Sequence, residues 1–376
     1  MASKNTVLII GQLPPTITGQ SLVTEEVYNI LVEHGAKIKV HNLVYSDYKY
    51  FVKYFVLIKI LVFISLDIIS CKSVIYLSAS RTLIGFYRNA YIILLGSFFK
   101  RKIIIHFHCG EYNDFVLGNG FLFKKIAKWL FRLVDTSIIL GKSLTNNYTS
   151  IFNEKMEIIV IPNGVSIKEN LNLNSNDAIL NILYMSNLIE SKGYFDILEA
   201  INILVNDYKI INIRVDFCGK FLDHEDNLSF KTVEEYISYF NDFVYSNNLN
   251  KFINYHKVVT GVTKDLLLQN CDIFILPTYY STEAQPLSIL EALSYGKIVI
   301  STNHRGIPDM VINGYNGLIV GKKSPKSIAD AILKLVNDES LQKKMSLNSK
   351  IHVENNFSFE IFERNIVHLF NKYQSI

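Results

Sequence analysis

Two glutamates, Glu283 and Glu291, stand eight positions apart around the expected start of a helix. The segment Cys271–Pro277 has the composition of a short buried strand, and a loop then leads to Pro286, a residue that suits the first position of a helix. The N–H groups at a helix start point outward and form a natural seat for a phosphate or diphosphate. Two acids around such a seat suggest a ligand with hydroxyl groups on either side of its phosphates. A nucleotide-sugar fits that description.

The expected helix from Leu287 to Tyr295 carries a single charge, Glu291, among leucine, isoleucine and alanine on every side. A helix that is apolar all round is typically buried, and a buried carboxylate is rarely tolerated without a partner. We therefore expect Glu291 to be buried and paired.

A glycine-containing loop, Gly11–Ser21, joins the first expected strand to the first expected helix. Gly19, together with the N–H groups of Gln20 and Ser21, could let a phosphate approach the backbone closely. The loop matches neither of the common glycine-rich phosphate motifs. A plain strand–helix turn is therefore an equally good interpretation of this loop taken alone.

Lys192 and His108 each follow an expected strand. Lys192, in the segment Tyr184–Gly193, would lie at the start of the next helix, beside a diphosphate gathered there; an ordinary surface lysine is the alternative. His106 and His108 alternate with Phe107 and so share one strand face. A core or loop-capping histidine is the usual alternative for either. The position at the strand end favours a binding role for His108.

Several kinds of chemistry have no motif in the chain. Asp-x-Asp is absent, so we expect no divalent ion bridging a diphosphate, no other metal and no cofactor. Ser-His-Asp order, CxxC, HExxH, GxSxG and nucleic-acid signatures are absent as well. The four cysteines are scattered as in reduced cytosolic proteins, and the sequence predicts no signal peptide and no membrane-spanning run.

The charge of the chain is unevenly divided. Residues 1–163 hold 18 Lys and Arg against 10 Asp and Glu, whereas residues 164–376 hold 20 against 24. Within the basic half, the aromatic and aliphatic segments 47–70 and 91–102 are interspersed with lysines. We expect them either to rest on an anionic membrane surface or to form core helices whose lysines reach solvent.

Short apolar runs alternate with helical patterns along the whole chain, with helices expected from about Ser21, Asp47, Arg81, Phe121 and Ser143 in the first half. This order is typical of parallel sheets built from strand–helix–strand units. The expected strands are Thr6–Ile10, Lys37–His41, Ser73–Leu77, Lys102–Phe107, Thr136–Leu140, Glu157–Ile161, Asn181–Met185, Ile213–Cys218, Phe252–His256, Asp272–Leu276, Ile298–Ser301 and Gly317–Val320.

Two such halves predict an α/β protein with two Rossmann-like domains, one over residues 1–163 and one over 164–356, with the turn Ile161–Gly164 as the linker. No strand follows the last helix, within residues 357–376, so we expect it to pack back on the first domain. Residues 221–251 read as an insertion whose aromatic helix is interpreted as packing rather than as a binding site.

Together these features resemble the retaining family 4 glycosyltransferases of the GT-B fold, in which two Rossmann-like domains face a cleft. The residues that carry the resemblance are Glu283 and Glu291 after a strand ending in Pro277, the Asn187–Gly193 loop, Ile161–Val165 and Asn303–Pro308. The loop Gly11–Ser21 is similar to that of bacterial members that build O-antigen, capsule or other lipid-linked glycans.

The resemblance implies a role for each matching residue. Glu283 would contact the donor sugar, Glu291 the ribose, and Lys192 the diphosphate. The family commonly has an arginine where this chain has Asn187, so Arg305 or another cation would have to supply that charge. The implied catalytic residues are Glu283, His108 and Lys192, and the implied donor-binding residues are Gly19, Gln20, Asn187, Gly193, Gly261, Val262, Gln285, Pro286, Leu287, Ser288, Glu291 and Arg305.

The implied activity is metal-independent transfer of a sugar, with retention, from a UDP-sugar or, as second choice, a GDP-sugar. The acceptor would be a growing, lipid-linked bacterial surface glycan, and the protein would be cytoplasmic and peripheral on the inner face of the membrane. A nucleotide-sugar epimerase or hydrolase on the same fold, and an inactive transferase-like partner subunit, are the alternatives. No nucleic-acid partner is expected.

Overall fold

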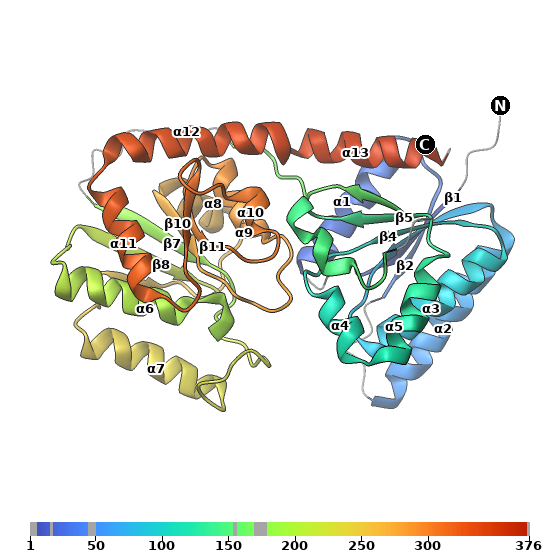
Figure 1. Ribbon diagram of the computed structural model, residues 1–376, viewed down its shortest axis with the longest axis horizontal. Helices are drawn as coiled ribbons and strands as arrows, with labels where there is room; N and C mark the ends of the chain where they lie inside the picture. Colours follow the sequence, from blue (N-terminus) through green and yellow to red (C-terminus); the bar gives the residue numbers. More distant parts are fainter. Residues whose placement is uncertain (1–5, 16–17, 44–49, 153–155, 169–178, 374–376) are drawn as a thin grey trace. The chain divides into compact units, whose positions relative to one another are not determined.

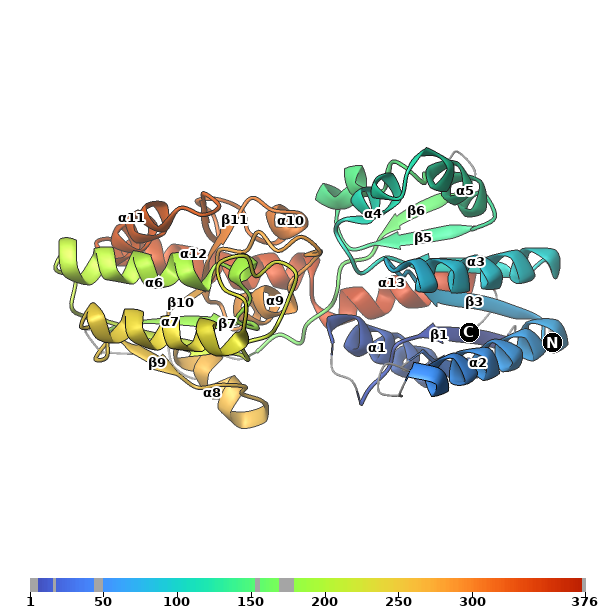
Figure 2. The ribbon, with the colours of Figure 1, turned by 90° about the horizontal axis from the view of Figure 1, so that it is seen from below.

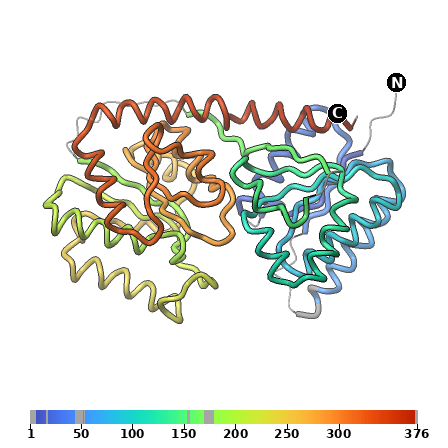
Figure 3. The backbone as a smooth tube through the Cα atoms, in the orientation of Figure 1, coloured from blue at the N-terminus to red at the C-terminus, as the bar shows by residue number. Residues whose placement is uncertain are grey.

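The computed structural model describes residues 6–15, 18–43, 50–152, 156–168 and 179–373. The chain forms two compact units. Unit 1 comprises Met1–Gly164 together with Phe359–Ile376, and unit 2 comprises Val165–Ser358. The backbone trace shows the chain leaving unit 1 after residue 164 and returning to it for the last helix (Figure 3).

Unit 1 is an alternation of strands and helices (Figure 1). Its elements are β1 (Thr6–Gly11), α1 (Gly19–Glu33), β2 (Ile38–Asn42), α2 (Tyr50–Ser70), β3 (Ser73–Ser78), α3 (Leu83–Phe98), β4 (Lys102–His106), α4 (Tyr112–Gly118), α5 (Phe121–Phe131), β5 (Thr136–Ile139), the 3-10 helix η1 (Lys142–Tyr148), β6 (Glu157–Val160) and α13 (Phe359–Lys372).

Within the described residues, the sheet of unit 1 has six parallel strands in the order β2-β1-β3-β4-β5-β6. Side chains alternate between its faces. Val7, Ile9 and Tyr76 point to the face that α1 and α13 cover. Helices α2, α3 and α5 cover the opposite face (Figure 1), where Gly96 of α3 lies close to Ile75.

Unit 2 repeats the alternation. Its elements are β7 (Leu180–Met185), η2 (Glu190–Lys192), α6 (Tyr194–Asn202), the π-helical turn η3 (Ile203–Asp207), β8 (Ile213–Cys218), α7 (Val233–Ser246), β9 (Ile253–Tyr255), α8 (Gly261–Asn270), β10 (Ile273–Leu276), α9 (Leu287–Ser294), β11 (Ile298–Thr302), α10 (Ile307–Met310), β12 (Gly317–Val320), α11 (Pro325–Val336) and α12 (Glu339–Asn356).

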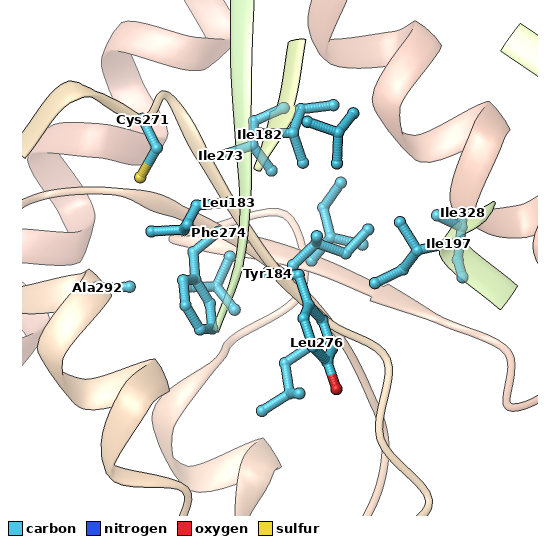
Figure 4. Packing of buried hydrophobic residues seen from close by; sticks show 14 of the residues in the cluster. Ile182, Leu183, Tyr184, Ile197, Cys271, Ile273, Phe274, Leu276, Ala292 and Ile328 are labelled. Carbon is cyan, nitrogen blue, oxygen red and sulfur yellow. The ribbon is translucent and has the colours of Figure 1, made fainter. Parts of the chain in front are cut away.

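In the part of unit 2 that the structure describes, six parallel strands follow the order β12-β11-β10-β7-β8-β9. The apolar side chains of β7 and β10 form the centre of a core that α6, α9 and α11 close (Figure 4). Helix α7 lies beside α6 (Figure 2). It buries Tyr236 and Phe240, so the aromatic residues of this insertion serve packing, as the sequence indicated.

The predicted fold class is confirmed, since each predicted strand is present with ends that differ by at most one residue. The helix start expected near Asp47 lies outside the described residues, and α2 is described from Tyr50. The segment after Ser143 is a 3-10 helix, and α4 was not predicted. Among the described helices, none combines the length and the apolar character needed to cross a bilayer.

Candidate active site

Strands β7 and β10 lie side by side at the centre of the unit 2 sheet, and the chain winds away from them in opposite directions. Ligands of open parallel sheets bind at such a switch point, outside the carboxyl ends of the strands. The loop after β7 leads to Lys192, and the loop after β10 leads through Glu283 to α9. The fold therefore gathers two of the loops that the sequence singled out.

A buried ion pair joins these two loops. Lys192 Nζ lies 2.5 Å from Glu283 Oε2, and the two side chains are 12% and 9% exposed. The same ammonium lies 4.2 Å from the centre of the Tyr280 ring. Thr278 Oγ1 donates to the Glu283 carboxylate over 3.4 Å. The switch point thus presents one cation and one anion to a ligand, side by side.

Gly193 lets the Lys192 loop pass against the β10 loop. Its φ is +80°, and a Cβ atom at this position would lie 2.6 Å from the carbonyl oxygen of Pro277. A side chain is therefore excluded both by the left-handed backbone and by the neighbouring loop. Tyr279 N–H donates to the carbonyl of Ser191 over 2.7 Å and holds the two loops at this separation.

Helix α9 begins at Leu287, with Pro286 as its N-cap and no side-chain cap bond. Pro286 was expected as the first helical residue, and it stands one position earlier because its ψ of 114° is extended. Gln285 is buried and Ser288 is half-buried. In an α-helix the first N–H groups have no carbonyl of their own helix to bind, so those of Leu287 and Ser288 are available to an anion here.

Glu291 is paired but not buried. Its carboxylate is about a third exposed and lies 2.5 Å from Nζ of Lys264, on α8. The expectation of burial is wrong because the face of α9 that carries Glu291 meets the start of α8 instead of the core. Gly261, with a φ of +55°, and the exposed Val262 begin that same helix, one turn before Lys264.

A histidine and two cations follow β11 and β12. His304 Nε2 lies 2.8 Å from the carbonyl oxygen of Tyr280, and Lys322 Nζ lies 2.8 Å from His304 Nδ1. Since the ammonium can only donate, the ring proton is on Nε2 and donates to the carbonyl. Burial, together with the charges of Lys322 and Arg305, lowers the pKa of His304. The neutral ring therefore links the Tyr280 loop to Lys322 by one hydrogen bond to each.

Arg305 has a φ of +51°, and the next residue, Gly306, donates its N–H to the carbonyl of Ala284 over 3.0 Å. The Arg305 loop is thereby attached to the residue after Glu283. Burial and the charge of Arg305 lower the pKa of Lys322. Arg305 and Lys322 thus lie on loops that contact the Glu283 loop and the Tyr280 loop, and an anionic group bound beside them would offset their positive charge.

The loop after β8 forms hydrogen bonds with both the Lys192 loop and the Glu283 loop. Asp226 accepts hydrogen bonds from Ser191 Oγ over 2.7 Å and from Ser281 N–H over 3.2 Å. Glu190, next to Ser191, accepts from Leu228 and Ser229 N–H. Asp226, Leu228 and Ser229 lie in the insertion of residues 221–251, before the aromatic helix that the sequence assigned to packing, and no local motif marks them.

Within the described residues, the side chain of Asn187 takes part in none of these contacts. Its side chain is exposed, and its carbonyl accepts from Tyr184 Oη over 3.0 Å. Asn187 is thus a backbone anchor for the loop.

The remaining candidate residues lie on unit 1. Helix α1 begins at Gly19, two residues before the expected start, with Thr18 as N-cap. The expectation for the Ser21 N–H is wrong, because this group already donates to Thr18 Oγ1 over 3.1 Å in a capping box. Gly19 is exposed and Gln20 is half-buried, and both lie in the first turn of α1.

His106 and His108 share one side of the chain, as the alternation predicted, with ring centres 4.0 Å apart. Tyr76 Oη lies 2.6 Å from His106 Nδ1. Within the described residues, the buried Nε2 atoms of both histidines have no hydrogen-bond partner. Burial lowers the pKa of His108 to about 3, so the ring is neutral near pH 7. A neutral imidazole can bind a hydroxyl group without adding charge.

No group of three or more His, Cys, Asp and Glu side chains is arranged to hold a metal ion in the described parts of either unit. Lys192 and Glu283 are the candidate catalytic residues that the structure brings into contact. Sequence reasoning missed Lys264, His304, Lys322 and Asp226, which meet the site through contacts between distant loops.

The chain is similar in sequence to known glycosyltransferases. Residues 166–352 match the model of the family described as glycosyl transferases group 1. An uncharacterized glycosyltransferase of Methanocaldococcus jannaschii is 25% identical over 308 residues, which is 76% of this chain and 72% of the relative. A Campylobacter jejuni N,N'-diacetylbacillosaminyl-diphospho-undecaprenol alpha-1,3-N-acetylgalactosaminyltransferase is 37% identical over 91 residues, 24% of each chain.

The fold of the whole chain is also found in solved structures. The structure of HepE from Anabaena in complex with UDP aligns with a TM-score of 0.72 at 14% identity and covers 98% of this chain and 100% of that one. The family match lies within unit 2, which carries Lys192, Glu283 and Glu291. The protein is therefore a glycosyltransferase of the GT-B fold, and its unit 2 belongs to the glycosyl transferases group 1 family.

Proposed function

We propose that the protein transfers a sugar from a nucleotide-diphosphate donor, with retention of anomeric configuration and without a metal ion, to a growing lipid-linked bacterial glycan. The UDP-sugar is the favoured donor and the GDP-sugar the second choice. The observation that carries the proposal is the buried Lys192–Glu283 pair at the β7/β10 switch point, directly before the start of α9.

The pair suits a donor because its two members recognise different parts of one molecule. The Lys192 ammonium would take a diphosphate oxygen, and the N–H groups of Leu287 and Ser288 would bind the same anion. Glu283 would then accept hydrogen bonds from sugar hydroxyls. In the free protein each side chain neutralises the other, so neither charge is buried alone.

The nucleoside would lie towards α8. Glu291, which is paired with Lys264, would accept hydrogen bonds from the ribose hydroxyls. The start of α8, with Gly261 and Val262, would border the base. Two residues of unit 1 complete the proposal. His108 would bind the sugar through its neutral imidazole, and Gly19, which has no side chain, would let the phosphates approach the backbone.

Catalysis would then be electrostatic. As the bond between the sugar and the diphosphate breaks, negative charge grows on the leaving oxygen, where Lys192 and the α9 N–H groups stabilise it. The acceptor hydroxyl attacks the same face of the sugar, and its proton passes to the leaving diphosphate. The family commonly stabilises the diphosphate charge with an arginine at the position of Asn187. Here Arg305 and Lys322 would supply that positive charge.

Two comparisons support the finer parts of the proposal. The Anabaena relative of the same fold was solved with UDP, which favours a uridine donor. The Campylobacter relative is named for a diphospho-undecaprenol acceptor, which favours a lipid-linked one. A lipid-linked acceptor would bring the protein to the cytoplasmic membrane surface.

The test is ligand binding followed by turnover. Calorimetric titration of UDP, GDP and ADP, each with magnesium and with a chelator, should give one preferred diphosphate whose affinity is unchanged by the chelator. Glu283→Ala should keep UDP affinity within about threefold, since Glu283 would meet the sugar, while sugar transfer falls by about a hundredfold or more.

Other results would redirect the assignment. Transfer unchanged by Glu283→Ala would remove the proposed site. Absence of binding to any diphosphate or its sugar conjugates would favour the inactive partner subunit. Conversion of the donor to an epimer or a free sugar at the same rate with and without acceptor would favour the epimerase or hydrolase.

A further inference from the structure

The outward faces of α2, α3 and α5 are apolar, although outward faces of surface helices are normally polar. In the described residues, eight exposed large hydrophobic side chains lie on α2, six on α3 and four on α5. We call this surface the three-helix face. Its members are Val52, Tyr54, Phe55, Ile58, Val62, Phe63, Leu66, Ile69, Leu83, Ile84, Tyr87, Tyr91, Leu94, Phe98, Phe121, Leu122, Ile126 and Trp129.

These helices form one continuous layer on one face of the unit 1 sheet (Figure 1). Ser65 Oγ and Tyr91 Oη lie 2.7 Å apart and join α2 to α3. The buried rings of Phe86 and Phe123, with centres 4.5 Å apart, join α3 to α5. Because the inner sides of the helices pack on the sheet, the exposed side chains point away from it as a single apolar surface. A patch of this extent marks an interaction site.

The charges on the same layer are almost all positive. The sequences of α2, α3 and α5 contain five lysines and one arginine, the buried Arg88, and Asp67 is their one acid. Asp67 pairs with Lys39 and His41, so its charge is neutralised within unit 1. On α5, Lys125 Nζ lies 4.4 Å from the centre of the Phe121 ring. The lysine thus lies along an aromatic side chain and keeps its ammonium at the surface, as at a membrane interface.

We propose that the three-helix face is a membrane-binding surface that lies in the headgroup region of an anionic bilayer. Apolar and aromatic side chains with a basic surround are the composition of interfacial helices, and tyrosine and tryptophan favour that depth. A second copy of the chain fits less well, since apposing two such faces would bring lysines against lysines. The inference deepens the proposed function and rests on it only for the lipid-linked acceptor.

The chain carries its own probe of this surface. Trp129 is the single tryptophan of the sequence, lies on α5 and is 52% exposed. On addition of vesicles that contain phosphatidylglycerol, its emission should shift to shorter wavelength and be quenched by lipids brominated near the headgroup end of the chain. Vesicles of phosphatidylcholine alone should give a much smaller change, and high salt should weaken the anionic response.

Matched pairs of variants distinguish loss of the three-helix face from a general loss of exposed hydrophobic side chains. Phe121→Ser with Leu122→Ser should weaken vesicle co-sedimentation by about tenfold or more, because both side chains are at least 70% exposed and would enter the lipid. Ile211→Ser with Leu347→Ser removes exposed hydrophobic side chains from unit 2 and should change nothing.

The charges are tested in the same way. Lys125→Gln with Lys128→Gln should lower affinity for anionic vesicles by about tenfold or more. Lys343→Gln with Lys344→Gln makes the same change of net charge on α12 and should leave vesicle binding intact.

Three results would overturn the proposal. The first is an unchanged Trp129 spectrum with anionic vesicles. The second is equal vesicle binding by the α5 variants and their controls. The third is a dimer of the unmodified protein that is lost on Phe121→Ser/Leu122→Ser substitution, with neither protein binding vesicles. UDP binding is measured on the same samples. Failure of vesicle binding with UDP binding retained would therefore reject this inference and leave the proposed function standing.

Discussion

Lys192 and Glu283 are separated by 91 positions in the sequence, yet their charged atoms lie 2.5 Å apart in the structure. Each side chain neutralises the other in a mostly buried setting. Removing one partner leaves an uncompensated charge, whereas removing both leaves none. We expect Lys192→Ala and Glu283→Ala each to lower the free energy of unfolding by about 3 kcal/mol, and the double variant to lose less than the sum.

Urea denaturation at pH 7 measures these differences. The exposed pair Lys326–Asp330, 3.7 Å apart on α11, is the control, and its removal should cost about 0.5 kcal/mol or less. Strictly additive losses for Lys192 and Glu283 would show that the two charges do not stabilise each other.

Gly193→Ala should disturb the site and not only the backbone. The new Cβ would meet the Pro277 carbonyl at 2.6 Å, so the Lys192 loop must move away from the β10 loop. We expect a loss of about 2 kcal/mol in stability, with donor affinity reduced about tenfold. Gly314→Ala is a matched control, since Gly314 has a φ of +77° but nothing within 4 Å of the added atom.

Gly314→Ala should therefore cost about 1 kcal/mol and leave donor affinity unchanged. Thermal unfolding and UDP titration on both variants give the comparison. Equal effects of the two substitutions would mean that backbone strain, and not the contact with Pro277, governs position 193.

Asp226 is expected to matter for donor binding although it touches neither Lys192 nor Glu283. Its carboxylate holds Ser191 and Ser281, which lie in the two loops that carry the pair. Asp226→Ala should raise the KM for the donor by about tenfold with a smaller change in kcat, because the loops would be less well ordered before binding.

Steady-state kinetics with varied donor concentration test this expectation. Asp223→Ala removes an exposed carboxylate from the same loop and should leave KM unchanged. A similar rise of KM in both variants would show that the net charge of the loop matters, and not the hydrogen bonds of Asp226 with Ser191 and Ser281.

The stability of unit 2 should depend on pH through Asp196, in the first turn of α6. Burial, with a further contribution from the charge of Glu199, raises the pKa of Asp196 to about 6. The folded state therefore takes up this proton at higher pH than the unfolded state, and stability falls as pH rises from about 4 to 6. Above that range, ionised Asp196 lowers stability by about 1–2 kcal/mol, allowing for its partial exposure.

Asp196→Asn should consequently raise the melting temperature at pH 7.5 and have no effect below pH 4, as measured by calorimetry across that range. Glu199→Gln should shift the midpoint of the transition to lower pH, because it removes the repelling charge. A stabilisation by Asp196→Asn that is the same at every pH would contradict this account.

The strands were predictable because buried parallel strands are short runs of isoleucine, valine and leucine bounded by turn residues, as in Ile298–Thr302. The meeting of the Lys192 and Glu283 loops followed from topology, since both come after strands at one switch point. Lys264, Lys322 and Asp226 could not be found in this way. Their partners lie on other loops or helices, and the distance between them is set by packing that no local pattern records.

Two expectations, for the Ser21 N–H group and for the burial of Glu291, failed because of local contacts. Thr18 Oγ1 accepts the Ser21 N–H and Ser21 Oγ accepts the Thr18 N–H, so this capping box removes the Ser21 N–H from the groups that a phosphate could bind. Glu291 was expected to be buried because its helix looked apolar all round, whereas the short α9 leaves one side to α8.

Helix α13 has a consequence for the order in which the protein folds. It follows the whole of unit 2 in the sequence, yet Phe362, Ile366 and Phe370 complete the core beneath β1 and β3, which precede unit 2. On the ribosome, one apolar side of the unit 1 sheet must stay uncovered until α13 has been synthesised, whereas unit 2 has its whole sequence before that point. A nascent chain arrested before residue 359 should therefore carry a protease-resistant unit 2 and a protease-sensitive unit 1 that needs chaperone cover.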